Sequence, residues 1–462
     1  MRKVWTKRRE RKVVDRFHIV SYIDYIQKIL PEYFEKKDRQ EDGRNRCKTV
    51  TFKVTDDCNL RCTYCYQIKK QRKTMSWETA KKFVDFLLNS TPDNNSYINA
   101  VDYPGIVIDF IGGEPLLEIE LIEKICDYIE EQLILRKHPW LETHRYSICS
   151  NGILYQTPKV QKFLEKYGKL TSFSITIDGN QKLHDACRVF PDGRPSYQIV
   201  LEAIRMHMKR NRTMGSKVTF APGNIAHVSE AMIHLLELGF RDIHANCVFE
   251  DVWDNEVHPK IFYEELKKLA DYYICHDLVE TQYISLFEEG LFRPMEAEEN
   301  TNWCGGDGQM LACDTEGILY PCIRFMETSL GAEQKPMVIG TLEEGIGNST
   351  HCQECLSCLK GITRKSQSTE ECFSCPVAKG CAWCTAFNYQ AFGTPNKRTT
   401  YSCGMQKARA LANVYFWNSY YRKKGLLERM KCYLPYVSVS QIIDKEEYDR
   451  LVELSKEGGG VD

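Results

Sequence analysis

The stretch Thr55–Tyr66 reads TDDCNLRCTYCY and places Cys58, Cys62 and Cys65 close together in one short segment. A closed structural zinc site or an ordinary iron–sulfur cluster needs four protein ligands. Three thiolates around one cluster would leave one metal open to a small molecule, and an open metal position can carry out chemistry. From the residues alone, the alternatives are a zinc knuckle that lacks a ligand, or cysteines that pack as small hydrophobic side chains.

The composition is that of a soluble chain with enough apolar residues for a full core. The chain has 462 residues, of which 43% are hydrophobic, and this length predicts two or three domains or one large barrel with additions. The net charge of −1 provides no general attraction to nucleic acid or acidic lipid. The sequence has no apolar run of about 18 residues and no signal-peptide pattern. We therefore expect a cytoplasmic protein with neither nucleic acid nor a membrane as a partner.

The chain holds 21 cysteines, which is more than packing alone explains. Disulfides are a poor explanation, because the cytosol keeps thiols reduced. Cysteines at clustered spacings indicate metal binding, and iron with sulfur fits these spacings best.

The segment 48–250 alternates short β-rich runs with amphipathic helical runs, which predicts an α/β fold. The predicted strands are 48–54, 106–111, 146–149, 172–177, 217–221 and 242–249. The predicted helices are 77–89 with Ser76 as its cap, 119–135, 159–167, 196–209 and 228–238. Six successive βα units imply a parallel sheet with helices outside it, and an active site at the carboxyl ends of the strands.

The pattern divides the chain into five segments. They are a basic, helical extension at 1–46, a core at 47–250, a helical and acidic bridge at 251–303, a cysteine-rich region of little periodicity at 304–404, and a C-terminal helix and tail at 405–462. The basic run at the N-terminus is either a solvated helix face or a docking strip for an acidic peptide. The cysteine-rich composition suggests a region that metal holds together.

The run from Cys58 to Cys65 resembles the radical S-adenosylmethionine (SAM) signature CxxxCxxC, in which an aromatic residue, here Tyr64, precedes the last cysteine. The resemblance implies a partial (β/α)6 TIM-like barrel and a [4Fe–4S] cluster on the three cysteines. The fourth iron of that cluster would be chelated by the amino and carboxylate groups of SAM. One electron would then split SAM into methionine and a 5′-deoxyadenosyl radical, which takes a hydrogen atom from the substrate.

The loop after the second predicted strand contains Gly112, Gly113, Glu114 and Pro115. Glycines let the backbone approach a ligand closely, and Glu114 can accept a hydrogen bond from an ammonium group. A glycine turn followed by proline is commonplace, but this one stands one strand after the cysteine loop. It resembles the family's GGEP motif, which holds the amino group of SAM.

Two further loops resemble motifs of the same family. Ser150 and Asn151, before Gly152, match an SNG turn in which Asn151 either contacts SAM or only forms the Asn-Gly turn. Thr176 and Asp178 match the SxDG pattern, with Thr in place of Ser, and the resemblance implies that the Thr176 hydroxyl faces the SAM ribose. Arg188 would grip the SAM carboxylate as a planar bidentate donor, while Asp178 and His184 would hold the turn. Asn246 is a weaker ligand candidate.

The C-terminal cysteines resemble the SPASM extension, which follows the radical SAM core in enzymes that modify peptides. Carrying over the pattern gives a first auxiliary [4Fe–4S] cluster on Cys304, Cys322 and Cys384, with Cys313 or an open iron as the fourth position. It gives a second auxiliary cluster, and three clusters in all, on the ligand set Cys372, Cys375, Cys381 and Cys403. Zinc is the main rival, since it also favours Cys-x2-Cys pairs.

Two departures from the pattern argue against a sulfatase-maturing enzyme. The spacing from Cys381 to Cys384 is x2 rather than x3, and Ile323-Arg324 follows Cys322 where those enzymes carry an aspartate base. A further set, Cys352, Cys355 and Cys358, could complete the first auxiliary cluster, bind another metal or form a thiol relay. The residues do not decide among these roles.

The resemblance, from about Lys48 to Cys403, implies an oxidoreductase that acts on a ribosomally made precursor peptide. We expect thioether formation from a cysteine sulfur to carbon, with Arg324 and the basic N-terminus steering an acidic peptide; carbon–carbon cross-linking and epimerisation are the alternatives. An electron donor such as flavodoxin or ferredoxin would be needed, and the short extension at 1–46 predicts a separate leader-binding protein or another leader-binding surface. A non-catalytic iron–sulfur carrier is the rival class, but it needs four ligands per cluster.

Overall fold

The structure is a computed structural model that describes residues 47–210, 214–296, 299–300, 304–331, 333–429 and 434–456. The predicted N-terminal extension at 1–46 lies outside these residues. The described residues form two compact units: the first lies within Met1–Thr176, Val189–Thr213 and Cys304–Gly361, and the second within Ile177–Arg188, Met214–Trp303 and Ile362–Asp462. The five predicted segments stay a prediction.

The described strands of the first unit lie in the order β11-β10-β9-β8-β1-β2-β3-β4. Their bounds are β1 Cys47–Thr55, β2 Gly105–Gly112, β3 His144–Ser150, β4 Thr171–Ile175, β8 Met310–Cys313, β9 Ile318–Tyr320, β10 Gly340–Thr341 and β11 Gly345–Ile346. Strands β1 to β4 are parallel to one another, and β8 adds a further parallel strand beside β1. Strands β9, β10 and β11 continue from β8 in antiparallel fashion. The carboxyl ends of β1 to β4 therefore share one edge.

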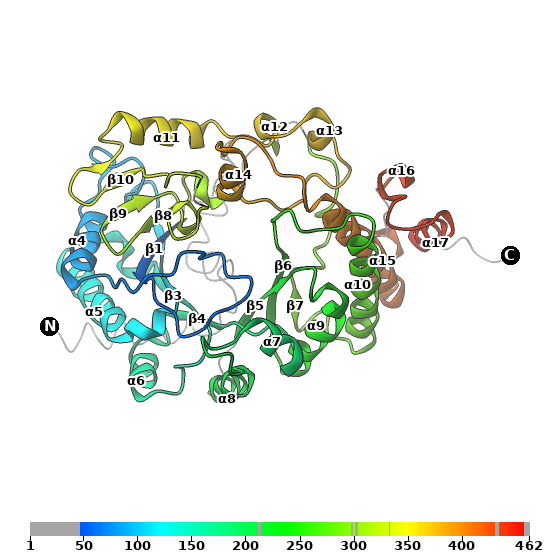
Figure 1. Cartoon of the computed structure of the whole chain (residues 1–462), viewed down its shortest axis with the longest axis horizontal. Coiled ribbons are helices and arrows are strands. Elements are labelled where there is room, and N and C mark those ends of the chain that lie inside the picture. The colour runs from blue at the N-terminus through cyan, green and yellow to red at the C-terminus, as the bar shows by residue number, and fades with distance from the viewer. Residues whose placement is uncertain are drawn as a thin grey trace. The chain divides into compact units, whose positions relative to one another are not determined.

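Helices cover one face of these strands. The helices of the first unit are α4 Trp77–Leu88, α5 Ile119–Leu135, α6 Pro158–Tyr167, α8 Tyr197–Met208 and α11 Thr350–Lys360, and α4, α5 and α6 follow one another along the outside of the strands (Figure 1). Ser76 caps α4, because its hydroxyl accepts a hydrogen bond from the backbone N–H of Thr79 at 3.0 Å. Phe52 on β1 packs against Phe83 on α4, with ring centroids 4.5 Å apart. Lys53, the next residue, must therefore point to the other face of the sheet.

The second unit is also an α/β arrangement. Its strands lie in the order β5-β6-β7, all parallel, with bounds Gly215–Phe220, Asp242–Cys247 and Tyr283–Ile284. Helix α10 packs against both α9 and α15 beside these strands (Figure 1). The helices are α7 Gln181–Cys187, α9 Val228–Glu237, α10 His258–Cys275, α12 Arg364–Gln367, α13 Glu370–Phe373, α14 Thr385–Phe392, α15 Cys403–Lys424, α16 Tyr436–Val439 and α17 Lys445–Ser455.

The predicted α/β class and its parallel strands are confirmed. Two predictions about later segments are wrong. Among the described residues of the helical bridge expected at 251–303, the α-helix is α10, which ends at Cys275, and a short strand and irregular segments follow it. The region 304–403 is more regular than its lack of periodicity suggested, since β8 hydrogen-bonds to β1 and α11 and α14 are well-formed helices. Strands of two to four residues are too short to show a period in the sequence.

No helix in the described part of the chain has the length and apolar character needed to cross a membrane.

Candidate active site and cysteine centres

The cysteine loop begins where β1 ends, at the edge that the parallel strands share. Cys58 is buried, and its sulfur accepts a hydrogen bond from the backbone N–H of Leu60 at 3.4 Å. Burial raises the pKa of the Cys58 thiol to about 11, although the nearby Lys70 ammonium lowers it in part. Cys62 and Cys65 are half-buried, and the backbone N–H of Cys65 donates to the carbonyl of Cys62 at 3.3 Å. The turn that this bond closes contains Tyr64.

The glycines after β2 lie directly on the cysteine loop. The N–H of Gly113 donates to the Thr55 carbonyl at 3.0 Å, and the N–H of Glu114 donates to the Asp57 carbonyl at 2.9 Å. A Cβ on Gly113 would lie 2.2 Å from the Asp57 oxygen and 2.8 Å from the Cβ of Cys58. Glycine is therefore required here because two backbone segments of the protein meet. The predicted close approach of these glycines to a ligand stays a prediction, whereas the structure shows their close approach to the cysteine loop.

The Glu114 carboxylate joins the loops after β2 and β3. It is 1% exposed and accepts hydrogen bonds from the Leu116 N–H at 3.0 Å, the Ser150 hydroxyl at 2.7 Å and the Asn151 N–H at 2.8 Å. A carboxylate offers about four acceptor positions, so protein donors already use most of them. The predicted contact of Glu114 with an ammonium group stays a prediction. What the geometry shows is a structural role. Pro115 then begins the short helix η2 Pro115–Glu118.

Asn151 links β3 to the cysteine loop. Its side-chain amide nitrogen donates to the Asn59 side chain at 2.7 Å and lies 3.9 Å from the Cys58 sulfur. Its side-chain oxygen accepts from the Ile153 N–H at 3.1 Å, so the Asn-Gly turn predicted from sequence is present as well. The Thr176 hydroxyl donates to the Ser150 carbonyl at 3.0 Å, which places it at the same edge.

The second unit holds Asp178, His184 and Arg188 in one buried cluster. Arg188 donates through Nε to the Asp178 carboxylate at 2.8 Å, and both side chains are at least nine-tenths buried. Burial lowers the pKa of His184 to about 3, and the Arg188 charge lowers it further, so this imidazole is neutral at ordinary pH. The expected structural role of Asp178 and His184 agrees with these contacts. Asn246 lies on β6 of the same unit, and its predicted role as a ligand stays a prediction.

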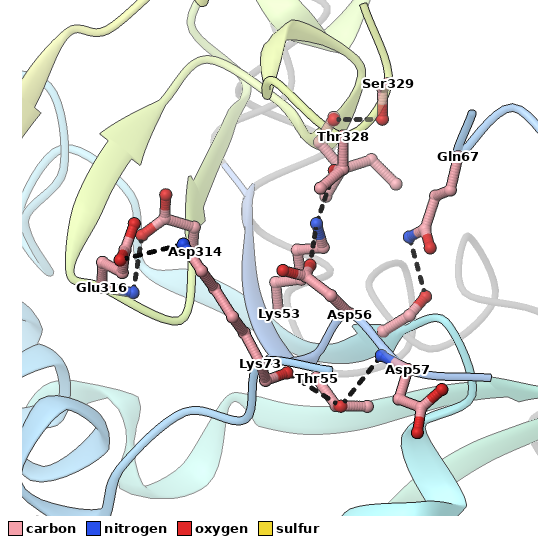
Figure 2. Close-up of polar contacts among 12 residues, drawn as sticks. Lys53, Thr55, Asp56, Asp57, Gln67, Lys73, Asp314, Glu316, Thr328 and Ser329 are labelled. Atoms are coloured by element: carbon pink, nitrogen blue, oxygen red, sulfur yellow. Dashed lines mark hydrogen bonds and ion pairs between the residues drawn. The ribbon is translucent and has the colours of Figure 1, made fainter. Parts of the chain in front are cut away.

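Sequence reasoning missed a buried lysine beside the cysteine loop. Figure 2 shows Lys53 between Asp56, with which it forms an ion pair, and the Thr328 hydroxyl, which accepts its hydrogen bond at 2.5 Å. Gln67, at the other end of the loop, donates to the Gly112 carbonyl at 2.9 Å (Figure 2). Both contacts join segments that are far apart in the chain, so no local sequence pattern predicts them.

Arg324 also approaches the cysteine loop. Its guanidinium lies over the ring of Tyr66, 5.2 Å from the centroid, in a cation–π contact. Tyr66 follows Cys65 directly, and Arg324 lies in the short helix η7 Ile323–Phe325 just after Cys322. This contact joins the segment after Cys322 to the core cysteine loop within the first unit.

The predicted ligands of the first auxiliary cluster are divided between the two units. Cys304 and Cys322 converge over Gly306, since a Cβ on that glycine would lie 3.7 Å and 3.6 Å from their sulfurs. Cys313 is fully buried on β8, and burial followed by the charges of Asp314 and Glu343 raises its pKa. Cys384, the remaining predicted ligand, belongs to the second unit.

The predicted ligands of the second auxiliary cluster lie together in the second unit. Burial raises the pKa of Cys403 to about 12, and the charges of Cys381, Cys372 and Cys375 raise it further. Burial also raises the pKa of Cys375, and Cys381 and Cys372 add to that shift. These mutual effects indicate that the four thiols lie near one another within the second unit. Their role as ligands of one cluster stays a prediction.

The extra cysteines lie on α11. Cys352 and Cys355 are buried on this helix, whereas Cys358 is exposed. The Cys355 sulfur lies 3.7 Å from Nε2 of His351, one turn earlier. Helix α11 also contacts the short helix η6 Gly305–Asp307, which follows Cys304. The structure brings these cysteines near one end of the first auxiliary site without fixing their role.

The donors of the cysteine loop fit a [4Fe–4S] cluster. Cys58, Cys62 and Cys65 supply three sulfur donors, and the Asn59 side-chain nitrogen is buried without a hydrogen-bond partner among the described residues. Buried N–H donors beside thiolates suit a negatively charged cluster. In the described part of the chain, no three His, Cys, Asp or Glu side chains gather closely enough to hold a single metal ion. A cubane has a wider requirement, because each thiolate binds its own iron.

Comparisons with known proteins agree with this reading. The chain matches the family model of the radical SAM superfamily over residues 52–227. The uncharacterized protein MJ0907 of Methanocaldococcus jannaschii is 32% identical over 200 residues, which are 42% of this chain and 61% of that protein. The radical SAM cyclopropyl synthase TigE of Paramaledivibacter caminithermalis is 21% identical over 419 residues, which are 81% of this chain and 80% of TigE.

A solved structure shares the fold. Native anSMEcpe with bound AdoMet and the Cp18Cys peptide aligns with a TM-score of 0.58 at 18% identity, over 83% of this chain and 99% of that one. The match to the family model therefore identifies residues 52–227 as a radical SAM domain. The chain matches 61% of the length of MJ0907.

Proposed function

We propose that this protein is a radical SAM enzyme that modifies a ribosomally made peptide, with Cys58, Cys62 and Cys65 as the ligands of its SAM-binding [4Fe–4S] cluster. The observation that carries the proposal is the position of these thiols. They follow β1 at the shared strand edge, where the Asn151 amide lies 3.9 Å from the Cys58 sulfur. When bound, the cluster supplies the electron that splits SAM. The chain's residues hold the ligands and shape the site around them.

The SAM contacts belong to the same proposal. Gly112, Gly113 and Thr176 would present backbone and hydroxyl groups to SAM, because they lie at the strand edge where the cysteine loop begins. Arg188 would bind the SAM carboxylate as a planar, bidentate donor. Glu114 would act by fixing the two loops on which the ligand rests.

A peptide substrate is supported by the relatives. The anSMEcpe structure has AdoMet and a peptide bound, and TigE is a radical SAM cyclopropyl synthase. The four converging thiols of the second unit support a further cluster of the SPASM type, on Cys372, Cys375, Cys381 and Cys403. A carrier of electrons alone would have no use for a three-cysteine site beside two ligand-binding loops.

We further propose that the modification is a thioether bond from a peptide cysteine to a carbon atom. Forming this bond breaks one S–H and one C–H bond and removes two protons and two electrons from the peptide. One proton and one electron leave together as the hydrogen atom that the 5′-deoxyadenosyl radical takes. The thiol proton goes to solvent, and an oxidised auxiliary cluster, when bound, would accept the second electron. The position of Arg324 supports an acidic peptide as the substrate, because the Arg324 guanidinium lies over the Tyr66 ring beside the cysteine loop. An electron donor such as flavodoxin or ferredoxin would reduce the SAM-binding cluster before each cleavage of SAM.

The test is anaerobic reconstitution with iron and sulfide, followed by SAM, dithionite and candidate precursor peptides, read by mass spectrometry. Loss of two hydrogen masses together with release of 5′-deoxyadenosine supports cross-linking, and protection by alkylation of the peptide thiol identifies a thioether. Deuterium uptake from solvent with no other mass change would instead indicate epimerisation. Cross-linking that survives thiol alkylation would contradict the thioether and favour a carbon–carbon bond.

A further inference from the structure

Two arginines of the second unit are buried beside Cys381. Arg364 is 1% exposed and Arg398 is 6% exposed. Arg398 donates through Nη2 to the Cys381 sulfur at 2.9 Å and to the Cys381 carbonyl at 3.0 Å. Arg364 donates to the same carbonyl at 3.4 Å and to the Ala378 carbonyl. Both guanidinium groups are therefore directed at one predicted cluster ligand.

Neither arginine has an acidic partner within the described part of the chain. Their hydrogen bonds go to backbone carbonyls and to one sulfur, and Arg364 Nε and Arg398 Nη1 are buried with no hydrogen-bond partner. A buried cation without a counter-charge is strongly unfavourable, so an anion should belong at this place.

Trp383 fixes the position of both cations. The guanidinium carbons of Arg364 and Arg398 lie over its indole ring, 4.5 Å and 4.8 Å from the centroid. A cation over an indole face is stabilised by the ring, and more so when water is excluded. Trp383 lies two residues after Cys381, so the short segment that carries this ligand also carries the platform for the arginines.

The four thiols beside these arginines would supply the missing anion. An oxidised [4Fe–4S] core bound by four thiolates is doubly negative, and one-electron reduction adds another negative charge. The two positive charges of the guanidinium groups equal the two negative charges of the oxidised cluster with its thiolates. Because potentials of such clusters depend on net charge, hydrogen bonds to sulfur and exposure to solvent, buried cations favour the reduced form.

We propose that Arg364 and Arg398 are the counter-cations of the second auxiliary cluster and that they raise its reduction potential. This inference rests on the proposed ligand set of Cys372, Cys375, Cys381 and Cys403. The two arginines act through the cluster and its Cys381 ligand, so they are positioning residues. A raised potential would suit a cluster that takes an electron from the substrate after hydrogen abstraction.

The experiment is a redox titration of the reconstituted full-length protein, followed by electron paramagnetic resonance. The signal that disappears in Cys381→Ala identifies the second auxiliary cluster. We expect Arg398→Gln to move the midpoint of that signal to a more negative potential while iron and sulfide contents stay at the wild-type level. Arg364→Gln, which removes the other cation, should shift the midpoint in the same direction.

Arg450→Gln is the matched control, because Arg450 is exposed and pairs with Glu446 on α17. Its midpoint should equal that of the wild type. If Arg398→Gln does not retain the cluster, the Arg364→Gln midpoint decides the question. An unchanged midpoint in a variant that retains the cluster would overturn the inference. A Cys381→Ala protein with the full iron content would instead overturn the ligand set, and with it that part of the proposed function.

Discussion

The carboxylate of Glu114 accepts a hydrogen bond from the backbone N–H of Asn151 at 2.8 Å, and so joins the loops that follow two neighbouring strands. The Asn151 amide in turn lies against the cysteine loop. Three loops at one sheet edge are thus held by a chain of buried polar contacts. Hydrogen bonds to a buried charge are among the stronger ones that a protein forms, and such a network fixes the geometry on which a ligand depends.

Glu114→Gln should destabilise the protein. The amide of glutamine replaces one acceptor oxygen with a donor, which would face a hydroxyl or N–H that now donates to Glu114. We expect the free energy of unfolding to fall by about 1.5–3 kcal/mol, measured by anaerobic chemical denaturation. Glu120→Gln, at an exposed position of the next helix, should change it by less than about 0.5 kcal/mol. Equal effects of the two substitutions would contradict the role given to Glu114.

Gly113→Ala should disturb the cysteine loop. The added methyl group would meet the Asp57 carbonyl at 2.2 Å and the Cβ of Cys58 at 2.8 Å, and backbone cannot move away as a flexible side chain can. We expect a reconstituted protein that has lost the iron of one cluster, about four atoms per chain, together with SAM cleavage. Gly223→Ala, which meets nothing within 4 Å, should keep both. Full iron content in Gly113→Ala would show that the loop tolerates the methyl group.

Arg188→Ala should lower the free energy of unfolding of the protein and also weaken its binding of SAM. The substitution leaves the Asp178 carboxylate buried without its cation. Loss of one partner of a buried ion pair costs about 3–5 kcal/mol of stability. The Asp178→Asn, Arg188→Gln double variant removes both charges, and should recover much of that loss while SAM binding stays weak. Recovery of SAM affinity in the double variant would mean that Arg188 does not contact SAM.

His184 predicts an acid-dependent loss of stability. Its pKa is lowered from 6.5 to about 3, so below pH 6.5 the unfolded chain binds a proton that the folded protein excludes. Stability should therefore fall as the pH falls, by about 1.4 kcal/mol per unit well below pH 6.5. Denaturation midpoints of the wild type and His184→Gln between pH 5 and 7 check this. The variant should show a correspondingly flatter dependence, and parallel curves would contradict the assignment.

The sequence predicts the parts of the fold that depend on local chemistry. The cap at Ser76, the strand before the cysteine loop and the helix over Ile119–Leu135 are all present as expected. Each depends on a period or a cap that a short window contains. The first parallel strands and the loops after them follow from the same signals.

What could not be predicted depends on contacts between distant segments. Lys53 pairs with Asp56 three residues later, but its other partner, the Thr328 hydroxyl, lies far along the chain. Strand β8 is short and owes its existence to pairing with β1. The arginines beside Cys381 belong to no motif, since only the folded chain brings Arg364 and Arg398 to Trp383.

The most direct test of the central claim is the yield of 5′-deoxyadenosine from SAM. Wild type and Cys58→Ala would be reconstituted with iron and sulfide without oxygen, reduced with dithionite and supplied with SAM. The proposed function predicts about twelve iron atoms per wild-type chain and clear release of 5′-deoxyadenosine. It predicts no release from Cys58→Ala, with the auxiliary clusters retained. Equal release from both proteins would contradict the assignment of Cys58, Cys62 and Cys65 to the SAM-binding cluster.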